Sequence, residues 1–332
     1  MNKFLFVGVD VSKKTLDWAF SEMSRQKIGD SHLKVENSRK GISKAMRWLK
    51  GKGYRKADIW VCMEHTGVYS ELMCEEMEDN GVRYSIAGSL SIKNSLGLIR
   101  GKDDKIDAYR ISWYLAMNYE SIEPSKLPPE VLRRITKLTA ERQTYVRDMV
   151  GAKARMKTLG RCDSAMAKAR LERKISQCES FIADIEREIS ELIKSDEAIS
   201  ENYKLLCTVP CIGFVNAVET IVNTVNFTAF DNVRKYACYI GIAPFRYESG
   251  TSVRGHTGVS KMGCTMAKSY LSQAAVSAIS MRHSMLRAIY ERRIAAGKAV
   301  GSALNVIKFK LASYMFSVIR NQKAFVPLPC YK

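Results

Sequence analysis

The run Phe4-Leu5-Phe6-Val7-Gly8-Val9-Asp10-Val11-Ser12 is apolar at almost every position and carries one acid near its end. Near-continuous apolar runs of this kind are typical of a strand that is buried on both faces of a sheet. Asp10 falls inside the run, where an unpaired charge would be costly. We therefore expect Asp10 either to be held by structural hydrogen bonds or to bind a metal ion.

Working outward from this run, strand and helix patterns alternate along the N-terminal part of the chain. The run at 58–64 is also apolar and also ends in an acid, Glu64. Further strands are expected at 13–20 and 82–87, and helices at 41–50, after residue 69 and from residue 104 onward. This alternation predicts an α/β domain with a mixed sheet.

A third acidic stretch, Arg100-Gly101-Lys102-Asp103-Asp104-Lys105-Ile106-Asp107-Ala108, opens the last of these helices. Asp104 and Asp107 are three residues apart, so they share one face of the helix. One interpretation is a salt-bridged helix start, with the acids near the positive end of the helix dipole. The other is a divalent-metal site, in which Asp10 and Glu64 join them, because Mg2+ prefers carboxylate oxygens and clustered carboxylates require neutralisation.

The charge of the chain indicates a polyanionic partner. Lys and Arg number 53 against 34 Asp and Glu, which gives a net charge of +19. Nucleic acid is the simplest partner for such a chain, although a ribosomal or chromatin-type binder would share this property. The nine cysteines form no CxxC pair, as expected for reduced thiols in a cytosol, and no apolar run approaches the length of a membrane span.

The central part of the chain has the pattern of two long helices. Pro124, Pro128 and Pro129 mark a linker, after which apolar residues recur in steps of four and three from Val131 to Leu159. Arg142 is the one charged member of this seam, and the pattern resumes from 171 to 192. We expect a coiled-coil hairpin or a dimerising arm, with an ordinary helical bundle as the alternative. The basic residues of the first helix form either a solvated face or a track for phosphates: Arg133, Arg134 and Lys137.

The C-terminal part is expected to be mainly helical, with one unusual loop. Residues 205–213 resemble the turn of a helix-hairpin-helix, with Cys211 where glycine is usual, and helices are expected at 265–281, 284–295 and 298–320. The intervening stretch 245–263 is small, polar, glycine-rich and basic, and loops of this length are usually functional or disordered. Ser249 could present a hydroxyl there, and three basic residues could contact phosphate: Arg254, His256 and Lys261.

With these motifs in view, the chain resembles the DEDD-type transposases of the IS110 family, the bridge-RNA-guided recombinases. Residues 7–12 are similar to the first acidic motif of that family and Met63-Glu64-His65-Thr66-Gly67 to the second. Residues 102–108 are similar to the third motif, with Asp103 in place of a family-typical threonine. Ser249-Gly250, Arg254 and residues 258–263 are similar to the nucleophilic-serine motif. The resemblance extends over nearly the whole chain.

The resemblance implies a fold of α/β plus α class. It implies a RuvC-like, RNase H-type catalytic domain at 1–123 with a mixed sheet, a linker and coiled-coil helical arm at 124–200, and a mainly helical transposase domain with the serine loop at 201–332. It also implies that Mg2+ is held by four acids while Ser249 attacks a DNA phosphodiester and forms a covalent phosphoserine link: Asp10, Glu64, Asp104 and Asp107.

The partners implied are donor and target DNA, a structured guide (bridge) RNA, and further copies of the chain in a homodimer or homotetramer with a composite active site. The resemblance implies a prokaryotic cytoplasm, at the nucleoid, and no membrane. Two alternatives stay open from the residues alone. One is a RuvC-like junction nuclease that uses the acids and water. The other is a non-catalytic, basic nucleic-acid-binding scaffold whose carboxylates form ordinary salt bridges.

Overall fold

A computed structural model describes residues 4–20, 31–95, 103–160, 163–245, 248–249, 253–254, 258–260, 262–282 and 284–327. The chain divides into two compact units, Met1–Leu127 and Pro128–Lys332. Each unit has its own hydrophobic core and is described separately.

The first unit is built on a five-stranded mixed sheet with the order β3-β2-β1-β4-β5. Its strands are β1 (Leu5–Val11), β2 (Thr15–Phe20), β3 (His32–Glu36), β4 (Ile59–Glu64) and β5 (Arg83–Ala87). Strands β1, β2 and β3 pair antiparallel, whereas β4 pairs parallel with both β1 and β5. The apolar run quoted first therefore forms the central strand, which is buried on both faces because helices cover the sheet on both sides.

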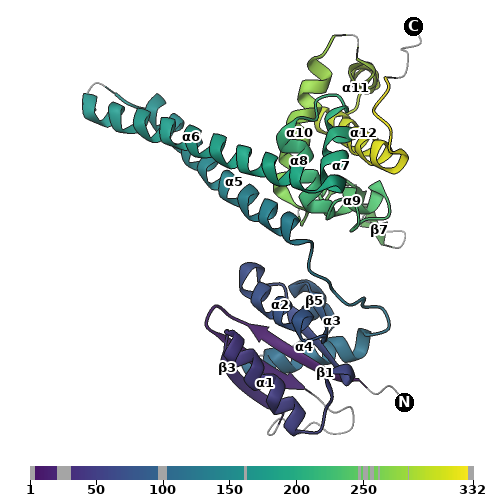
Figure 1. Ribbon diagram of the computed structural model, residues 1–332. Helices are drawn as coiled ribbons and strands as arrows, with labels where there is room; N and C mark the ends of the chain where they lie inside the picture. Colours follow the sequence, from purple (N-terminus) through teal and green to yellow (C-terminus); the bar gives the residue numbers. More distant parts are fainter. Residues whose placement is uncertain are drawn as a thin grey trace. The chain divides into compact units, whose positions relative to one another are not determined.

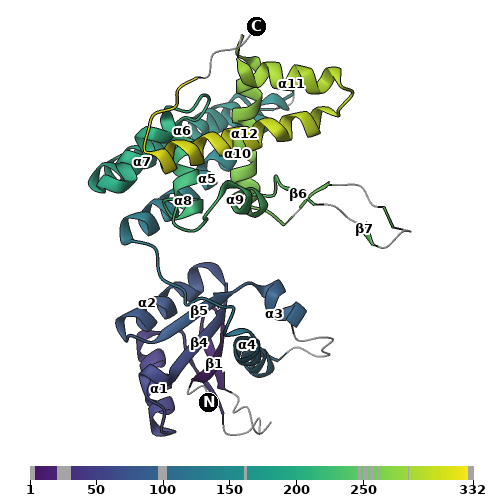
Figure 2. The ribbon, with the colours of Figure 1, turned by 90° about the vertical axis from the view of Figure 1, so that its right-hand side faces the viewer.

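Helices α1 (Arg39–Gly51) and α2 (Glu71–Asp79) pack on one face of this sheet, and α3 (Ser89–Ser95) and α4 (Asp104–Asn118) pack on the other (Figure 2). Two short 3-10 helices, Lys56–Asp58 and Gly67–Ser70, precede β4 and α2. The first face buries Val7 and Val9 of β1 with the apolar side of α1 and α2, and the second buries Phe6 of β1 with Ile111 and Leu115 of α4.

The second unit begins with two long helices, α5 (Glu130–Lys157) and α6 (Ala165–Ser195), which lie side by side (Figure 1). They run antiparallel, since Lys153 near the end of α5 pairs with Glu179 of α6, and Arg134 near its start pairs with Glu188. The apolar residues that recur in steps of four and three include buried side chains on both helices, among them Ile135, Ala152 and Cys178. Arg142, the charged member, pairs with Glu186 across the two helices.

The remaining helices, α7 (Glu197–Cys207), α8 (Phe214–Thr224), α9 (Val233–Tyr239), α10 (Thr265–Ser280), α11 (Met285–Ala295) and α12 (Val300–Asn321), share one core with the near end of the α5–α6 hairpin (Figure 1). Cys211 lies in the turn between α7 and α8 with a φ of 63°, the left-handed region that glycine normally fills. This explains why the sequence reads as a helix-hairpin-helix turn with a substituted glycine.

Four two-residue strands lie between α9 and α10. β6 (Pro244–Phe245) pairs with β9 (Gly258–Val259), and β7 (Glu248–Ser249) pairs with β8 (Val253–Arg254), both antiparallel. The sequence predicted a long loop at 245–263, and the described residues of this stretch include these short paired segments of two residues each. The role of the stretch as a serine loop stays a prediction.

The predicted fold class, a mixed α/β N-terminal part followed by a helical C-terminal part, is confirmed. Strand β3 was not expected. It is short, lies at the edge of the sheet and has one buried side chain, Val35, so its apolar signal is weak. None of the helices in the described ranges combines the length and apolar character that crossing a membrane requires.

Candidate active site

Two of the predicted acids lie at the same edge of the sheet. Asp10 is the next-to-last residue of β1 and Glu64 is the last residue of β4. These strands are neighbours and parallel, with Val9 opposite Met63, so their carboxyl ends meet. In open α/β sheets, ligands usually bind in the crevice at the carboxyl ends of the parallel strands.

Helix α4 brings the other two acids to this edge, and Gly8 allows it. A Cβ atom added at Gly8 would lie 2.0 Å from the carbonyl oxygen of Ala108 and 2.4 Å from the amide nitrogen of Ser112. Only a glycine lets the helix backbone approach β1 this closely. Asp10 lies two residues further along the strand, on the same face as Gly8, so the first turn of α4 with Asp104 and Asp107 comes close to it.

The electrostatics of Asp10 show that the other three predicted acids act on its carboxyl. The pKa of the half-buried Asp10 carboxyl is raised to about 6, mainly by burial and then by the charges of Asp104, Asp107 and Glu64, in that order, followed by Asp17. Both causes disfavour a carboxylate. The structure thus brings the other three predicted acids, Glu64, Asp104 and Asp107, into the electrostatic neighbourhood of Asp10.

Three of these acids are engaged by neighbouring groups in the structure. The hydroxyl of Ser89 donates to Oε1 of Glu64. Nη1 of Arg110 lies 2.5 Å from Oδ1 of Asp107, and Nζ of Lys34 lies 3.6 Å from Oδ2 of Asp104. Asp103 has a different role, since its side chain caps α4 by accepting from the backbone N–H of Lys105 at 3.1 Å.

Sequence reasoning missed a fifth acid, Asp17, and its two partners. Asp17 lies on β2 directly opposite Asp10, and its side chain is buried. Nε2 of His32 lies 2.9 Å from Oδ1 of Asp17, and Nζ of Lys34 lies 3.1 Å from Oδ2. The alternation of Leu16, Trp18 and Phe20 was a usable signal, because it turns Asp17 to the opposite face of β2.

The donor set fits a hard divalent cation. Carboxylate oxygens are the ligands that Mg2+ and related ions prefer, and a nearby cation would relieve the repulsion that raises the pKa of Asp10. Among the described residues, however, no group of three or more His, Cys, Asp or Glu side chains is arranged to hold a metal ion. The four acids are gathered, but the pairs formed by Lys34 and Arg110 hold two of them in other contacts.

The predicted serine lies in the second unit. Ser249 is the second residue of β7 and is paired in register with Val253 of β8, and Arg254 lies opposite Glu248. Before these strands, the side-chain N–H of Asn305 on α12 donates to the carbonyl oxygen of Ile242 at 2.7 Å. Three residues of the predicted motif lie outside the described residues: Gly250, His256 and Lys261.

The basic residues predicted for phosphate contact on the central arm lie near the start of α5: Arg133, Arg134 and Lys137. Arg134 is exposed, and its Nη2 lies 3.5 Å from Oε1 of Glu188 on α6. This pair is the weak, solvent-screened kind, so it leaves the guanidinium accessible to a polyanion.

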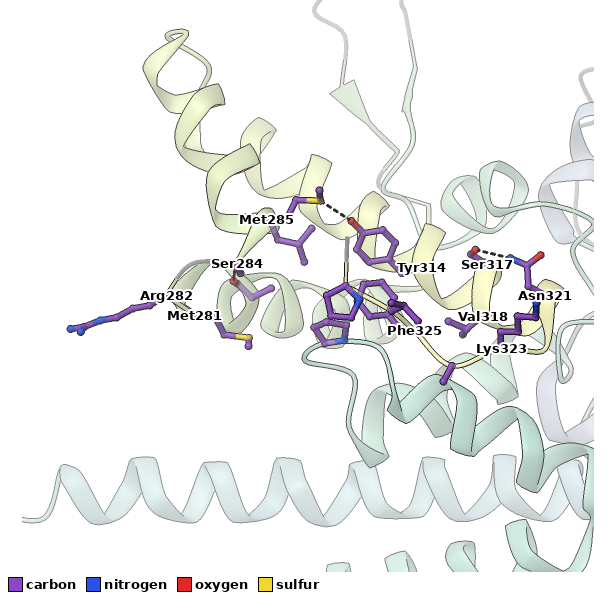
Figure 3. A pocket seen from close by; sticks show the side chains of 16 residues that line it. Met281, Arg282, Ser284, Met285, Tyr314, Ser317, Val318, Asn321, Lys323 and Phe325 are labelled. Carbon is purple, nitrogen blue, oxygen red and sulfur yellow. Dashed lines mark hydrogen bonds between the residues drawn. The ribbon is translucent and has the colours of Figure 1, made fainter. Parts of the chain in front are cut away.

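A cavity of about 700 Å3 in the second unit is separate from all of these residues. Met285, Tyr314 and Phe325 line it between α10, α11, α12 and the segment after α12 (Figure 3). None of the predicted site residues lies among its walls.

Two family models match the chain. Residues 7–159, which include all four predicted acids, match a transposase model of the DEDD type of IS110. Residues 203–291, which include Ser249, match the model of the transposase IS116/IS110/IS902 family. Two separate stretches of the chain are thus similar to transposase domains of the IS110 family. The family resemblance drawn from the motifs is confirmed at this level, and the DEDD domain supports the use of a divalent metal without identifying which metal.

Two curated relatives align with nearly the whole chain. The pilin gene-inverting proteins of Moraxella bovis and Moraxella lacunata are each 24% identical over 323 residues, which cover 96% of this chain and 97% of the relative. The two family models and the names of these relatives agree, since they describe transposases and gene-inverting proteins.

Proposed function

We propose that this protein is an IS110-type transposase that cuts and rejoins DNA strands through a Mg2+-binding cluster of acids and a serine nucleophile, guided by a structured RNA. The observation that carries the proposal is the convergence of Glu64, Asp104 and Asp107 on Asp10, in a chain whose second transposase domain contains Ser249. The acids and the serine lie in separate units, so the proposal includes a composite active site in a homodimer or homotetramer.

The acids would hold the metal. Asp10 and Glu64 come from the ends of adjacent strands, and Asp104 and Asp107 come from one helix turn, so the donors approach from two directions. When bound, Mg2+ would act as a Lewis acid on the phosphate and lower the pKa of a coordinated hydroxyl. Asp10 would be an anion in the loaded site, because a bound cation favours its ionised form.

The serine would carry the covalent step. The Oγ of Ser249 attacks the phosphorus of a DNA phosphodiester, forms a new O–P bond and displaces the 3′-oxygen. The serine proton is lost and the departing 3′-oxygen gains one, so the products are a phosphoserine diester and a free 3′-hydroxyl. Because one phosphate ester replaces another, the strands can be rejoined without ATP. Arg254 and Lys261 would stabilise the charged phosphorane, and His256 would contact the phosphates.

The partners would be nucleic acids. The net charge of +19 supports a polyanionic partner, and Arg133, Arg134 and Lys137 on α5 offer phosphate contacts. Guide RNA would pair with donor and target DNA and leave the protein to recognise backbone and shape. The names of the Moraxella relatives support rejoining as well as cutting. The setting we propose is the nucleoid of a prokaryotic cell.

The decisive experiment separates the serine from the acids. Ser249→Ala should abolish covalent protein–DNA adducts and lower strand exchange at least about 1,000-fold, because no other group replaces the nucleophile. Binding of RNA should stay within about twofold of wild type. Adducts are measured by denaturing gel electrophoresis of labelled DNA, and Ser252→Ala is the control, since it changes another serine three residues further along the sequence.

The same experiment tests both alternatives. If Ser249→Ala still cuts DNA in Mg2+ at the wild-type rate and wild type forms no adduct, the chain is a junction nuclease that uses water. If the wild-type chain binds nucleic acid but neither cuts nor exchanges strands with any divalent metal, the carboxylates are ordinary salt-bridge partners in a binding scaffold.

A further inference from the structure

The side chain of Lys34 connects the edge of the sheet to the acids of the candidate active site. Asp10 on β1, Asp17 on β2 and Lys34 on β3 are cross-strand neighbours in one row, because Asp10 lies opposite Asp17 and Asp17 lies opposite Lys34. All three therefore face the side of the sheet that α4 covers. Nζ of Lys34 lies 3.1 Å from Oδ2 of Asp17 and 3.6 Å from Oδ2 of Asp104 at the start of α4.

Asp17 fixes one end of this bridge. Its side chain is 5% exposed, and each carboxylate oxygen has its own partner, His32 on Oδ1 and Lys34 on Oδ2. A buried carboxylate that lost one of these partners would be strongly destabilised. Both oxygens of the Asp17 carboxylate are therefore paired, and the carboxylate holds the Lys34 ammonium next to Asp104.

The other end of the bridge is weaker. The side chains of Lys34 and Asp104 are 50% and 57% exposed, and their separation of 3.6 Å exceeds that of a hydrogen bond. An exposed pair of this kind contributes little and exchanges readily with solvent. The Lys34 ammonium is thus firmly held by Asp17 and loosely held by Asp104.

We propose that Lys34 is a built-in counterion of the metal site: it offsets the charge of Asp104 while no metal is bound, and it yields that carboxylate to an incoming divalent cation. This inference rests on the proposed metal site. The acids that surround Asp10 repel one another, so the metal-free protein needs a cation near them. A lysine supplies one positive charge without filling a ligand position. Arg110 has the same relation to Asp107, but it belongs to the same helix and pairs more closely.

The proposal predicts the sign of a change in metal affinity. If Lys34 only positioned Asp104 for the metal, replacing Lys34 would weaken metal binding. A counterion that competes with the metal would strengthen it, because a positive charge leaves the neighbourhood of the cation. With both side chains half-exposed, screening limits the gain to about three- to tenfold.

The test measures metal binding by the full chain without nucleic acid. Titration calorimetry with Mn2+ and with Mg2+ should give a dissociation constant about three- to tenfold lower for Lys34→Met than for wild type. Lys34→Arg keeps the charge and should bind like wild type. Lys56→Met is the matched control, since Lys56 is an exposed lysine of the same unit whose Nζ contacts Oδ1 of Asn80 at 2.8 Å, on α2's side of the sheet.

Thermal unfolding gives a second readout. In EDTA the Lys34→Met protein should melt several degrees below wild type, because Asp17 loses a partner. Saturating Mn2+ should raise the melting temperature of Lys34→Met by more than it raises that of wild type. Lys34→Gln, which can still donate to Asp17, replaces the methionine variant in both measurements if that variant does not fold.

Unchanged or weaker metal binding by the Lys34→Met or Lys34→Gln protein, in a chain whose wild type binds Mn2+, would overturn the role of Lys34 and leave the proposed function intact. A wild-type chain that binds neither Mn2+ nor Mg2+ would overturn the proposed metal site together with this inference. Tighter binding by Lys34→Met, with Lys34→Arg and Lys56→Met like wild type, supports it.

Discussion

Asp10 makes the metal-free protein less stable at neutral pH than it would be with a neutral side chain in the same place. Burial and the neighbouring acids raise the pKa of its carboxyl from 3.8 to about 6, so folding favours its protonated form. The folded state binds more protons than the unfolded state between these two values. The stability that protonated Asp10 contributes is therefore complete below about pH 4 and is lost as the pH rises through 6.

Replacing Asp10 by Asn should consequently stabilise the metal-free protein at pH 7 by about 1 kcal/mol, after allowance for solvent screening, and have little effect at pH 4. Urea unfolding in EDTA at both pH values measures the difference. Asp79→Asn, which changes an exposed acid of the same unit, is the control and should show a pH-dependent difference below about 0.5 kcal/mol. A destabilised Asp10→Asn protein at pH 7 would show that the carboxylate is favourably paired.

The residues of the site differ in how far the sequence predicted them. Asp10 and Glu64 could be identified because an acid at the end of an apolar strand is unusual, and Asp104 and Asp107 because their spacing places them on one helix face. The alternation along β2 could place Asp17 on the face opposite Leu16 and Trp18, but its contacts with His32 and Lys34 could not be predicted, since they depend on the pairing of β2 and β3. Cross-strand contacts are set by register, which a single strand pattern does not specify.

At the scale of elements, the contact between α4 and β1 determines whether the acids meet. Ala108, Ile111 and Leu115 bury one side of α4 against the sheet, and Gly8 gives the helix backbone room to reach β1. The close approach uses backbone atoms on the helix, which cannot rotate away as a side chain would. The sequence predicted both elements, but not that Gly8 sets the distance between them.

Gly8→Ala should therefore displace α4 and destabilise the first unit by about 3 kcal/mol, the upper part of the usual cost of overpacking a core. The displacement should also weaken Mn2+ binding, because Asp104 and Asp107 move with the helix. Gly51→Ala is the matched control. Nothing lies within 4 Å of a Cβ added at Gly51, so this variant should be within about 0.5 kcal/mol of wild type. Urea unfolding and calorimetry measure the two effects, and a Gly8→Ala protein of wild-type stability would show that α4 can shift without cost.

At the scale of the whole molecule, the division into two units limits what each can do alone. The carboxylates lie in the first unit and Ser249 lies in the second. Composition and motif order predicted the order of these parts along the chain: an α/β part, then a pair of long helices, then a helical part. They did not specify the contacts at the end of the first unit, since proline residues mark a linker without showing which of its backbone groups are hydrogen-bonded. The predicted domain boundary at residue 123 stays a prediction.

The segment after residue 123 gives that boundary a direct test. The backbone N–H of Ser125 donates to the carbonyl oxygen of Tyr84 at 2.8 Å, and its hydroxyl accepts from the N–H of Ile86 at 3.0 Å, so the segment is hydrogen-bonded to β5. The N–H of Leu127 donates to Oε1 of Glu78 at 2.6 Å, and its side chain packs on the core of the first unit.

A fragment of residues 1–127 should therefore unfold cooperatively and be more stable than residues 1–123 by about 2–3 kcal/mol, because each of these hydrogen bonds contributes about 1 kcal/mol and Leu127 adds apolar burial. Residues 1–129 are the matched control, since Pro128 and Pro129 lie in the second unit and should add nothing to the first. Urea unfolding of the three fragments measures the differences. Equal stability of 1–123 and 1–127 would place the end of the folding unit at residue 123, and a further gain in 1–129 would extend it into the second unit.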